Sequence, residues 1–93
     1  MELSTDEINA LVTVALAGGV HRAGWNYRVF AATASQGLTE IISKGKLYNT
    51  HKLTVAGMAA VLALPDDYSP PDGFYPRARD ILKAKAIVRG LTP

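Results

Sequence analysis

The chain of 93 residues contains no cysteine. This absence excludes a disulfide framework, a thiolate zinc site and a cysteine nucleophile. Histidine is also scarce, because only His21 and His51 are present, and neither has a carboxylate at the spacing of a metal-binding pair or a catalytic triad. We therefore expect no metal site, no cofactor and no catalytic residues, and the sequence predicts that the protein is not an enzyme.

Long apolar runs are missing as well. No stretch approaches the roughly 18 apolar residues that a membrane-spanning helix needs, and the first residues, Met1 to Glu7, are acidic where a secretory signal would be basic. We expect no membrane span and a cytoplasmic location. A chain this short holds one hydrophobic core and has little room for a deep substrate cleft, so residues 1–93 are predicted to form a single domain.

The clearest local pattern predicts a helix near the start of the chain. Ser4 and Glu7 have the spacing of a capping box, and Leu3 and Ile8 have the spacing of a hydrophobic staple. An apolar stripe with helical spacing follows and ends before two glycines; its members are Ile8, Leu11, Val12, Ala15 and Leu16. These patterns predict a helix over residues 5–17.

The rest of the chain is also predicted to be helical, which gives an all-α fold: a compact bundle of four or five short helices. Residues 21–34 are predicted to be helical because of their alanines, although residues 27–30 also permit a short strand. Further helices are predicted over residues 35–44 and from Thr50 or Thr54 to the residue before Pro65. The small residues of this last helix would let another helix approach closely, so self-association is a further expectation.

Residues 65–76 contain four prolines and one glycine, a composition that excludes regular helix or central strand. We call this segment the proline-rich arm. It contains three aromatic residues, Tyr68, Phe74 and Tyr75, in otherwise polar surroundings. These rings need a packing partner, which is either the domain itself or another chain, and the sequence leaves both open.

The small formal charge of +2 conceals a marked segregation of charge along the chain. Residues 41–64 carry +3 and residues 74–93 carry +4, with negative segments before and between them. A basic C-terminal helix is predicted over residues 77–89, with Gly90 as its C-terminal cap. Such a helix can dock on an acidic partner or lie along phosphates.

These features predict a non-enzymatic protein–protein interaction module, such as a small adaptor, inhibitor or assembly subunit. Residues 21–28 alternate aromatic and basic side chains, as do surfaces that anchor protein partners or stack bases. The expected partner is another protein. The residues predicted to contact it are Trp25, Tyr27, Arg28, Tyr68, Phe74, Tyr75, Arg77 and Arg79.

The alternative hypothesis is a nucleic-acid-binding protein that makes phosphate contacts through its basic segments. The helices predicted at residues 35–44 and 50–64 have the outline of a helix-turn-helix, with His51 and several lysines at their joint. However, the second helix has no Arg, Asn or Gln after Lys52 to read base edges. The residues predicted to contact phosphates are Lys44, Lys46, Lys52, Arg77, Arg79, Lys83, Lys85 and Arg89.

Overall fold

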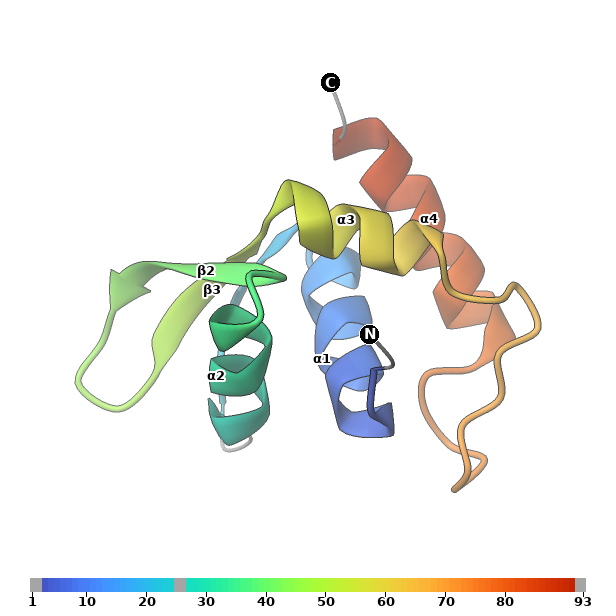
Figure 1. The fold of residues 1–93 in the computed structure, drawn as a ribbon, viewed down its shortest axis with the longest axis horizontal. Coiled ribbons are helices and arrows are strands. Elements are labelled where there is room, and N and C mark those ends of the chain that lie inside the picture. The colour runs from blue at the N-terminus through green and yellow to red at the C-terminus, as the bar shows by residue number, and fades with distance from the viewer. Residues whose placement is uncertain (1–2, 25–26, 92–93) are drawn as a thin grey trace.

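The computed structural model describes residues 3–24 and 27–91. In chain order the elements are α1 (Thr5–Leu16), β1 (Val20–Arg22), α2 (Tyr27–Ser35), β2 (Thr39–Lys44), β3 (Asn49–Leu53), α3 (Val55–Leu62) and α4 (Ala78–Leu91) (Figure 1). The predicted all-α helical bundle is therefore wrong. The protein is a small α/β fold in which helices pack against a three-stranded antiparallel sheet.

The sheet has the strand order β1-β3-β2, and both pairings are antiparallel. In the central strand, His51 lies opposite His21 of β1 and Ile41 of β2. Helix α1 lies between α2 and α4, and α3 crosses above it (Figure 1). The hairpin formed by β2 and β3 extends away from this body, on the side opposite α4.

The start of α1 confirms the predicted capping box. The Ser4 hydroxyl accepts a hydrogen bond from the Glu7 amide at 3.1 Å, and the Glu7 carboxylate accepts one from the Ser4 amide at 3.0 Å. The helix ends one residue before the predicted boundary, where Gly18 and Gly19 follow with φ angles of 87° and 93°. Only glycine adopts such angles without strain.

The helix predicted over residues 35–44 is wrong, because residues 39–44 form β2. Its β-branched residues suit a pleated strand once a pairing partner is present. Gly45 begins the hairpin turn, and its amide donates to the Tyr48 carbonyl at 3.0 Å. A Cβ at Gly45 would collide with that carbonyl, so the turn requires glycine.

The next two predictions are half correct. In the segment 21–34, the predicted helix is present from Tyr27 onward as α2, so the alternative of a strand at residues 27–30 is wrong, whereas residues 21–22 belong to β1, which was not predicted. In the segment 50–64, the first residues belong to β3, and the helix begins only after Thr54. The Thr54 hydroxyl accepts a hydrogen bond from the Gly57 amide at 3.0 Å, which makes Thr54 the N-cap.

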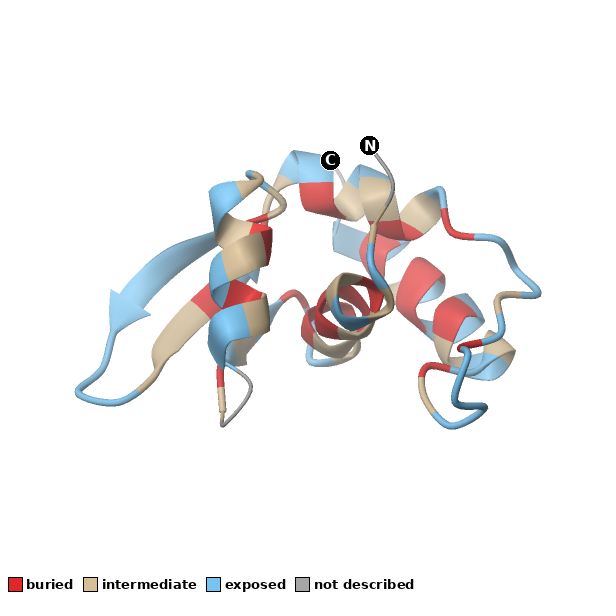
Figure 2. Ribbon diagram, turned by 60° about the horizontal axis from the view of Figure 1, so that its bottom comes forward, coloured by how far each residue is buried: buried red, intermediate tan, exposed pale blue. Residues whose placement is uncertain are grey.

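The basic C-terminal helix is present but longer than predicted. It runs over α4 and continues through Gly90, which is therefore not a C-terminal cap. The buried residues of α4 face α1 and α3, and Figure 2 shows buried positions concentrated on α1 and on the sides of α2 and α4 that face it. The largest fully buried side chains include Leu11, Val12, Phe30, Leu53, Val61, Ile81 and Val88.

A buried polar chain links α2 to the base of the hairpin. The Thr33 hydroxyl donates to the Phe30 carbonyl at 2.8 Å, so it accepts from the Thr39 hydroxyl at 3.0 Å. Thr39 then accepts from Nδ1 of His51 at 3.2 Å, which assigns the ring proton to that nitrogen. The Phe30 ring contacts the rings of both His51 and His21, at centroid distances of 5.5 and 5.6 Å.

The stability of the fold should depend on the protonation of His51. Burial lowers the pKa of this imidazole, and the nearby His21 lowers it further. The unfolded chain therefore binds this proton at a higher pH than the folded protein. The contribution of neutral His51 to the free energy of unfolding is fully present above about pH 6.5. It is lost as the pH falls from there towards the folded-state pKa.

We expect the free energy of unfolding, measured with urea, to be lower at about pH 5.5 than at about pH 7.5. His51→Gln removes the titrating group, so this difference should shrink in the variant. An unchanged pH dependence in His51→Gln would show that another group is responsible.

A matched pair of glycine substitutions tests how closely α3 packs on the chain before β2. A Cβ at Gly57 would collide with the Leu38 carbonyl, whereas a Cβ at Gly90 of α4 would meet no atom within 4 Å. Gly57→Ala should therefore lower the free energy of unfolding by about 1–3 kcal/mol. Gly90→Ala should raise it by about 0.4–1 kcal/mol, because alanine restricts the unfolded chain. Equal effects of the two substitutions on the denaturation midpoint would contradict this packing.

Candidate functional site

The hairpin of β2 and β3 carries positive charge at its free end. Lys44 ends β2, and Lys46 lies in the turn that leads to β3; both side chains are exposed. Arg22 of β1 reaches the same place, because its Nη2 lies 3.9 Å from the position of a Cβ on Gly45. Three cations therefore gather around one turn.

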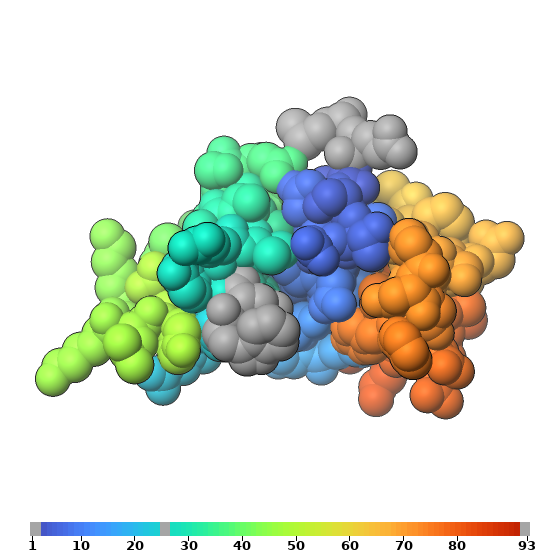
Figure 3. Space-filling model, turned by 90° about the horizontal axis from the view of Figure 1, so that it is seen from below, coloured from blue at the N-terminus to red at the C-terminus, as the bar shows by residue number. Residues whose placement is uncertain are grey.

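Two tyrosines lie beside these cations. Tyr27 is the first residue of α2, and its ring centroid lies 6.4 Å from that of Tyr48 in the hairpin. The guanidinium of Arg28 lies 6.0 Å from the centre of the Tyr27 ring. Figure 3 shows the face on which α2 (teal) and the hairpin (yellow-green) both reach the surface. We call the following six residues the hairpin-tip surface: Arg22, Tyr27, Arg28, Lys44, Lys46 and Tyr48.

Acidic residues are almost absent from this part of the chain. Between residues 8 and 65 there are five lysines and arginines and a single carboxylate, Glu40. Glu40 lies opposite Lys52 in the strand register, and about 13 Å of strand separates it from Lys44. Among the described residues, no carboxylate lies within ion-pair distance of the four cations of the hairpin-tip surface. Their mutual repulsion is therefore not relieved by a pairing within this part of the protein.

One edge of the hairpin-tip surface approaches α1. Arg28 lines a shallow surface hollow together with Asp6 and Glu7. The pKa of Glu7 is lowered, first by its hydrogen bond from the Ser4 backbone and then by one from the Gln36 side chain. The Glu7 carboxylate thus already accepts hydrogen bonds from Ser4 and Gln36. The other three cations of the hairpin-tip surface lie around the hairpin turn.

The basic residues of α4 have a different role. Lys85 is buried, with 5% of its surface exposed, and its ammonium group donates to the Leu64 carbonyl and, at 2.6 Å, to the Asp66 carboxylate. This hydrogen bond lowers the pKa of Asp66. Lys85 therefore holds the start of the proline-rich arm against α4, and its ammonium group is not exposed for contact with a phosphate.

The other cations near α4 lie far from the hairpin. The Arg77 guanidinium donates to the Phe74 carbonyl at 3.2 Å, which ties it to the arm. Arg79, Lys83 and Arg89 are exposed. Because α4 and the hairpin lie on opposite sides of α1 (Figure 1), the two predicted basic regions do not form one surface.

The proline-rich arm packs on its own domain. Tyr68 and Tyr75 are partly buried against the core, and Pro76 is fully buried. Burial raises the pKa of the Tyr75 hydroxyl. Phe74 differs, because 74% of its surface is exposed. The question that the sequence left open is thus settled for two of the three arm aromatics, which pack on the domain itself.

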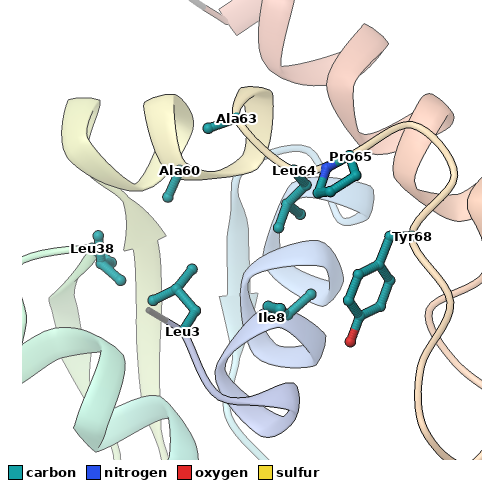
Figure 4. A pocket seen from close by; sticks show the side chains of 8 residues that line it. All are labelled: Leu3, Ile8, Leu38, Ala60, Ala63, Leu64, Pro65 and Tyr68. Carbon is teal, nitrogen blue, oxygen red and sulfur yellow. The ribbon is translucent and has the colours of Figure 1, made fainter. Parts of the chain in front are cut away.

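An apolar groove of ≈ 560 Å³ lies between α1, α3 and the arm (Figure 4). Its lining residues are Leu3, Ile8, Leu38, Ala60, Ala63, Leu64, Pro65 and Tyr68. The Tyr68 hydroxyl is the one polar side-chain group among them. The groove suits an apolar group but carries no pair of groups for acid–base chemistry.

Other chemistry has little support in the described residues. His51 is buried and hydrogen-bonded to Thr39. Neither histidine lines the apolar groove or the hollow beside Arg28. No cluster of three metal-ligating side chains occurs within residues 3–24 and 27–91. In the same part of the chain, no helix combines the length and apolar character needed to cross a membrane.

The structure brings together residues from two separate sequence predictions. Tyr27 and Arg28 were predicted to contact a protein partner, whereas Lys44 and Lys46 were predicted to contact phosphates at a joint between helices. The predicted joint is a hairpin, and its Tyr48 ring contacts Tyr27 of α2. Lys52 lies within β3, away from the tip, and Trp25 lies outside the described residues. Sequence reasoning did not name Arg22 or Tyr48. Arg22 lies within the alternating aromatic and basic segment 21–28, and Tyr48 lies within the basic segment 41–64.

The buried position of Lys85 predicts that it stabilises the fold. Lys85→Gln should lower the free energy of unfolding by about 1–3 kcal/mol, because the Leu64 carbonyl loses a charged hydrogen-bond donor. Lys83→Gln, an exposed neighbour on the same helix, is the control and should change it by less than about 0.5 kcal/mol. Chemical denaturation of both variants measures the difference; similar values would mean that the contact contributes nothing to stability.

The chain was also compared with known proteins. No protein-family model, curated protein or solved structure matches it. Its function must therefore be inferred from the chemistry of its own surface.

Proposed function

We propose that this protein binds nucleic acid through phosphate contacts of the hairpin-tip surface. The observation that carries the proposal is the gathering of four cations without a paired carboxylate, in a region with one acidic residue. Like charges held together repel one another, and a polyanion relieves this repulsion. Each phosphate neutralised by a lysine or arginine also releases condensed counterions, which favours binding.

The aromatic rings favour nucleic acid over an acidic protein as the partner. Tyr27 has 48% of its surface exposed, and its ring lies 6.0 Å from the Arg28 guanidinium and 6.4 Å from the Tyr48 ring of the hairpin. Surfaces that combine a positive track with tyrosine rings are typical of nucleic-acid binding, because the rings stack on bases.

Sequence-specific reading is not part of this proposal. Apart from Tyr27 and Arg28, the exposed residues of α2 are Ala31 and Ser35, which are short. A helix that reads base edges in the major groove needs longer polar side chains. We therefore propose binding that depends on the backbone and varies little with base sequence.

The protein–protein hypothesis has less support. Tyr68 and Tyr75 pack within the domain, and Phe74 alone of the arm aromatics remains well exposed. Hot spots at interfaces are usually clusters of anchors in a well-packed centre. A single exposed ring does not supply such a cluster.

Two double variants with the same change of charge test the proposal. Lys44→Gln/Lys46→Gln alters the hairpin turn, and Arg79→Gln/Lys83→Gln alters α4; each removes two positive charges from the formal +2. Binding of a fluorescein-labelled oligonucleotide of about 15 nucleotides is measured by anisotropy at several salt concentrations. The hairpin variant should bind at least about tenfold more weakly at about 50 mM salt, with a shallower salt dependence, because phosphate contacts are lost. The α4 variant should bind nearly as the unmodified protein does.

Three results would contradict the proposal. The first is no binding by the unmodified protein at low salt. The second is an equal loss of affinity in both double variants, which would indicate attraction by net charge alone. The third is equally tight binding of polyglutamate, which lacks bases and phosphates.

A further inference from the structure

The hairpin-tip surface is bordered by exposed apolar side chains. Leu47 in the turn has 78% of its surface exposed, and Ile42 on β2 has 50% exposed. These two side chains lie on the same hairpin as Lys44 and Lys46. The hairpin therefore offers exposed apolar side chains as well as cations to a ligand.

A base-paired duplex cannot use those groups well. Its bases are stacked on one another, so it presents phosphates and groove edges but not base faces. The tyrosine rings, Leu47 and Ile42 would then remain against water or sugar. An unpaired strand presents the apolar faces of its bases next to its phosphates, which is the combination that this surface can contact.

The two rings form a tilted aromatic pair. Their planes are inclined by 44°, and their centroids are 6.4 Å apart, so Tyr27 and Tyr48 do not stack on each other. The Arg28 guanidinium lies over the Tyr27 ring, 6.0 Å from its centre, as a cation–π contact on one face of that ring. Arg22, Lys44 and Lys46 lie around the hairpin turn that leads to Tyr48.

We propose that the ligand of the hairpin-tip surface is a single-stranded nucleic acid whose bases stack on Tyr27 and Tyr48 while Arg22, Lys44 and Lys46 contact its phosphates. This inference rests on the proposed function and names its substrate class. Stacking and phosphate contacts are common to DNA and RNA, so the chemistry is that of either unpaired strand.

The test compares three labelled ligands of about 15 nucleotides or base pairs: oligo-dT, oligo-U and a DNA duplex. The unmodified protein should bind both single strands more tightly than the duplex. The ratio of the oligo-dT and oligo-U dissociation constants then shows which strand the protein prefers.

Variants of Tyr27 separate stacking from electrostatic attraction. Tyr27 is exposed at the first position of α2, so Tyr27→Ala leaves the core intact, and circular dichroism confirms the fold. Tyr27→Ala should weaken binding of single strands by about 5- to 150-fold, the range expected for one stacked base. The slope of log affinity against log salt should stay the same, because no phosphate contact is lost. Tyr27→Phe keeps the ring and should retain most of the affinity.

The outcomes distinguish this inference from the proposed function. Duplex binding that is as tight as single-strand binding, or an unchanged affinity in Tyr27→Ala, overturns the single-strand inference; if Lys44→Gln/Lys46→Gln still weakens binding, the proposed function stands. Tighter duplex binding would instead indicate insertion of Leu47 between base steps, as apolar wedges do in the minor groove. Failure to bind any of the three ligands at about 50 mM salt overturns both.

Discussion

Strand β3 pairs with β1 on one side and with β2 on the other, and its register determines how the rest of the chain is arranged. His51 and Leu53 face the helices and are buried, and the Leu53 amide donates to the Gly19 carbonyl after α1 at 2.9 Å. The next residue, Thr54, caps α3. A shift by one residue would turn the buried side chains to solvent and bring Lys52 towards the core. The core and the hairpin thus depend on one pairing.

The protein uses positive charge in two different ways. At α4, Lys85 is buried and donates hydrogen bonds to the Leu64 carbonyl and the Asp66 carboxylate, which holds the start of the arm against the helix. At the hairpin tip, Lys44 and Lys46 are exposed, and nothing in the described residues neutralises them. Residues of the same type therefore differ in role because their burial differs, which composition alone does not reveal.

The base of the hairpin belongs to the core that stabilises the fold, whereas its tip is the part proposed to bind. Buried side chains reach as far as Thr39 and His51 at its base, and β2 is exposed from its second residue onward. Changes at the tip should therefore affect binding with little cost in stability. The His51 environment, in contrast, joins α2 to the sheet and affects the fold first.

The sequence by itself determined the features that depend on residues close to one another in the chain. The capping box and apolar stripe are sufficient to predict α1, and the prolines of residues 65–76 exclude regular structure under any packing. Residues 39–44 and 50–53 have apolar patterns that suit a helix or a strand, and only their pairing across the Gly45 turn satisfies their backbone groups as strands. The meeting of Tyr27 with Tyr48 and the burial of Lys85 were likewise decided by the tertiary structure, because they join residues distant in sequence, whose contacts no local pattern encodes.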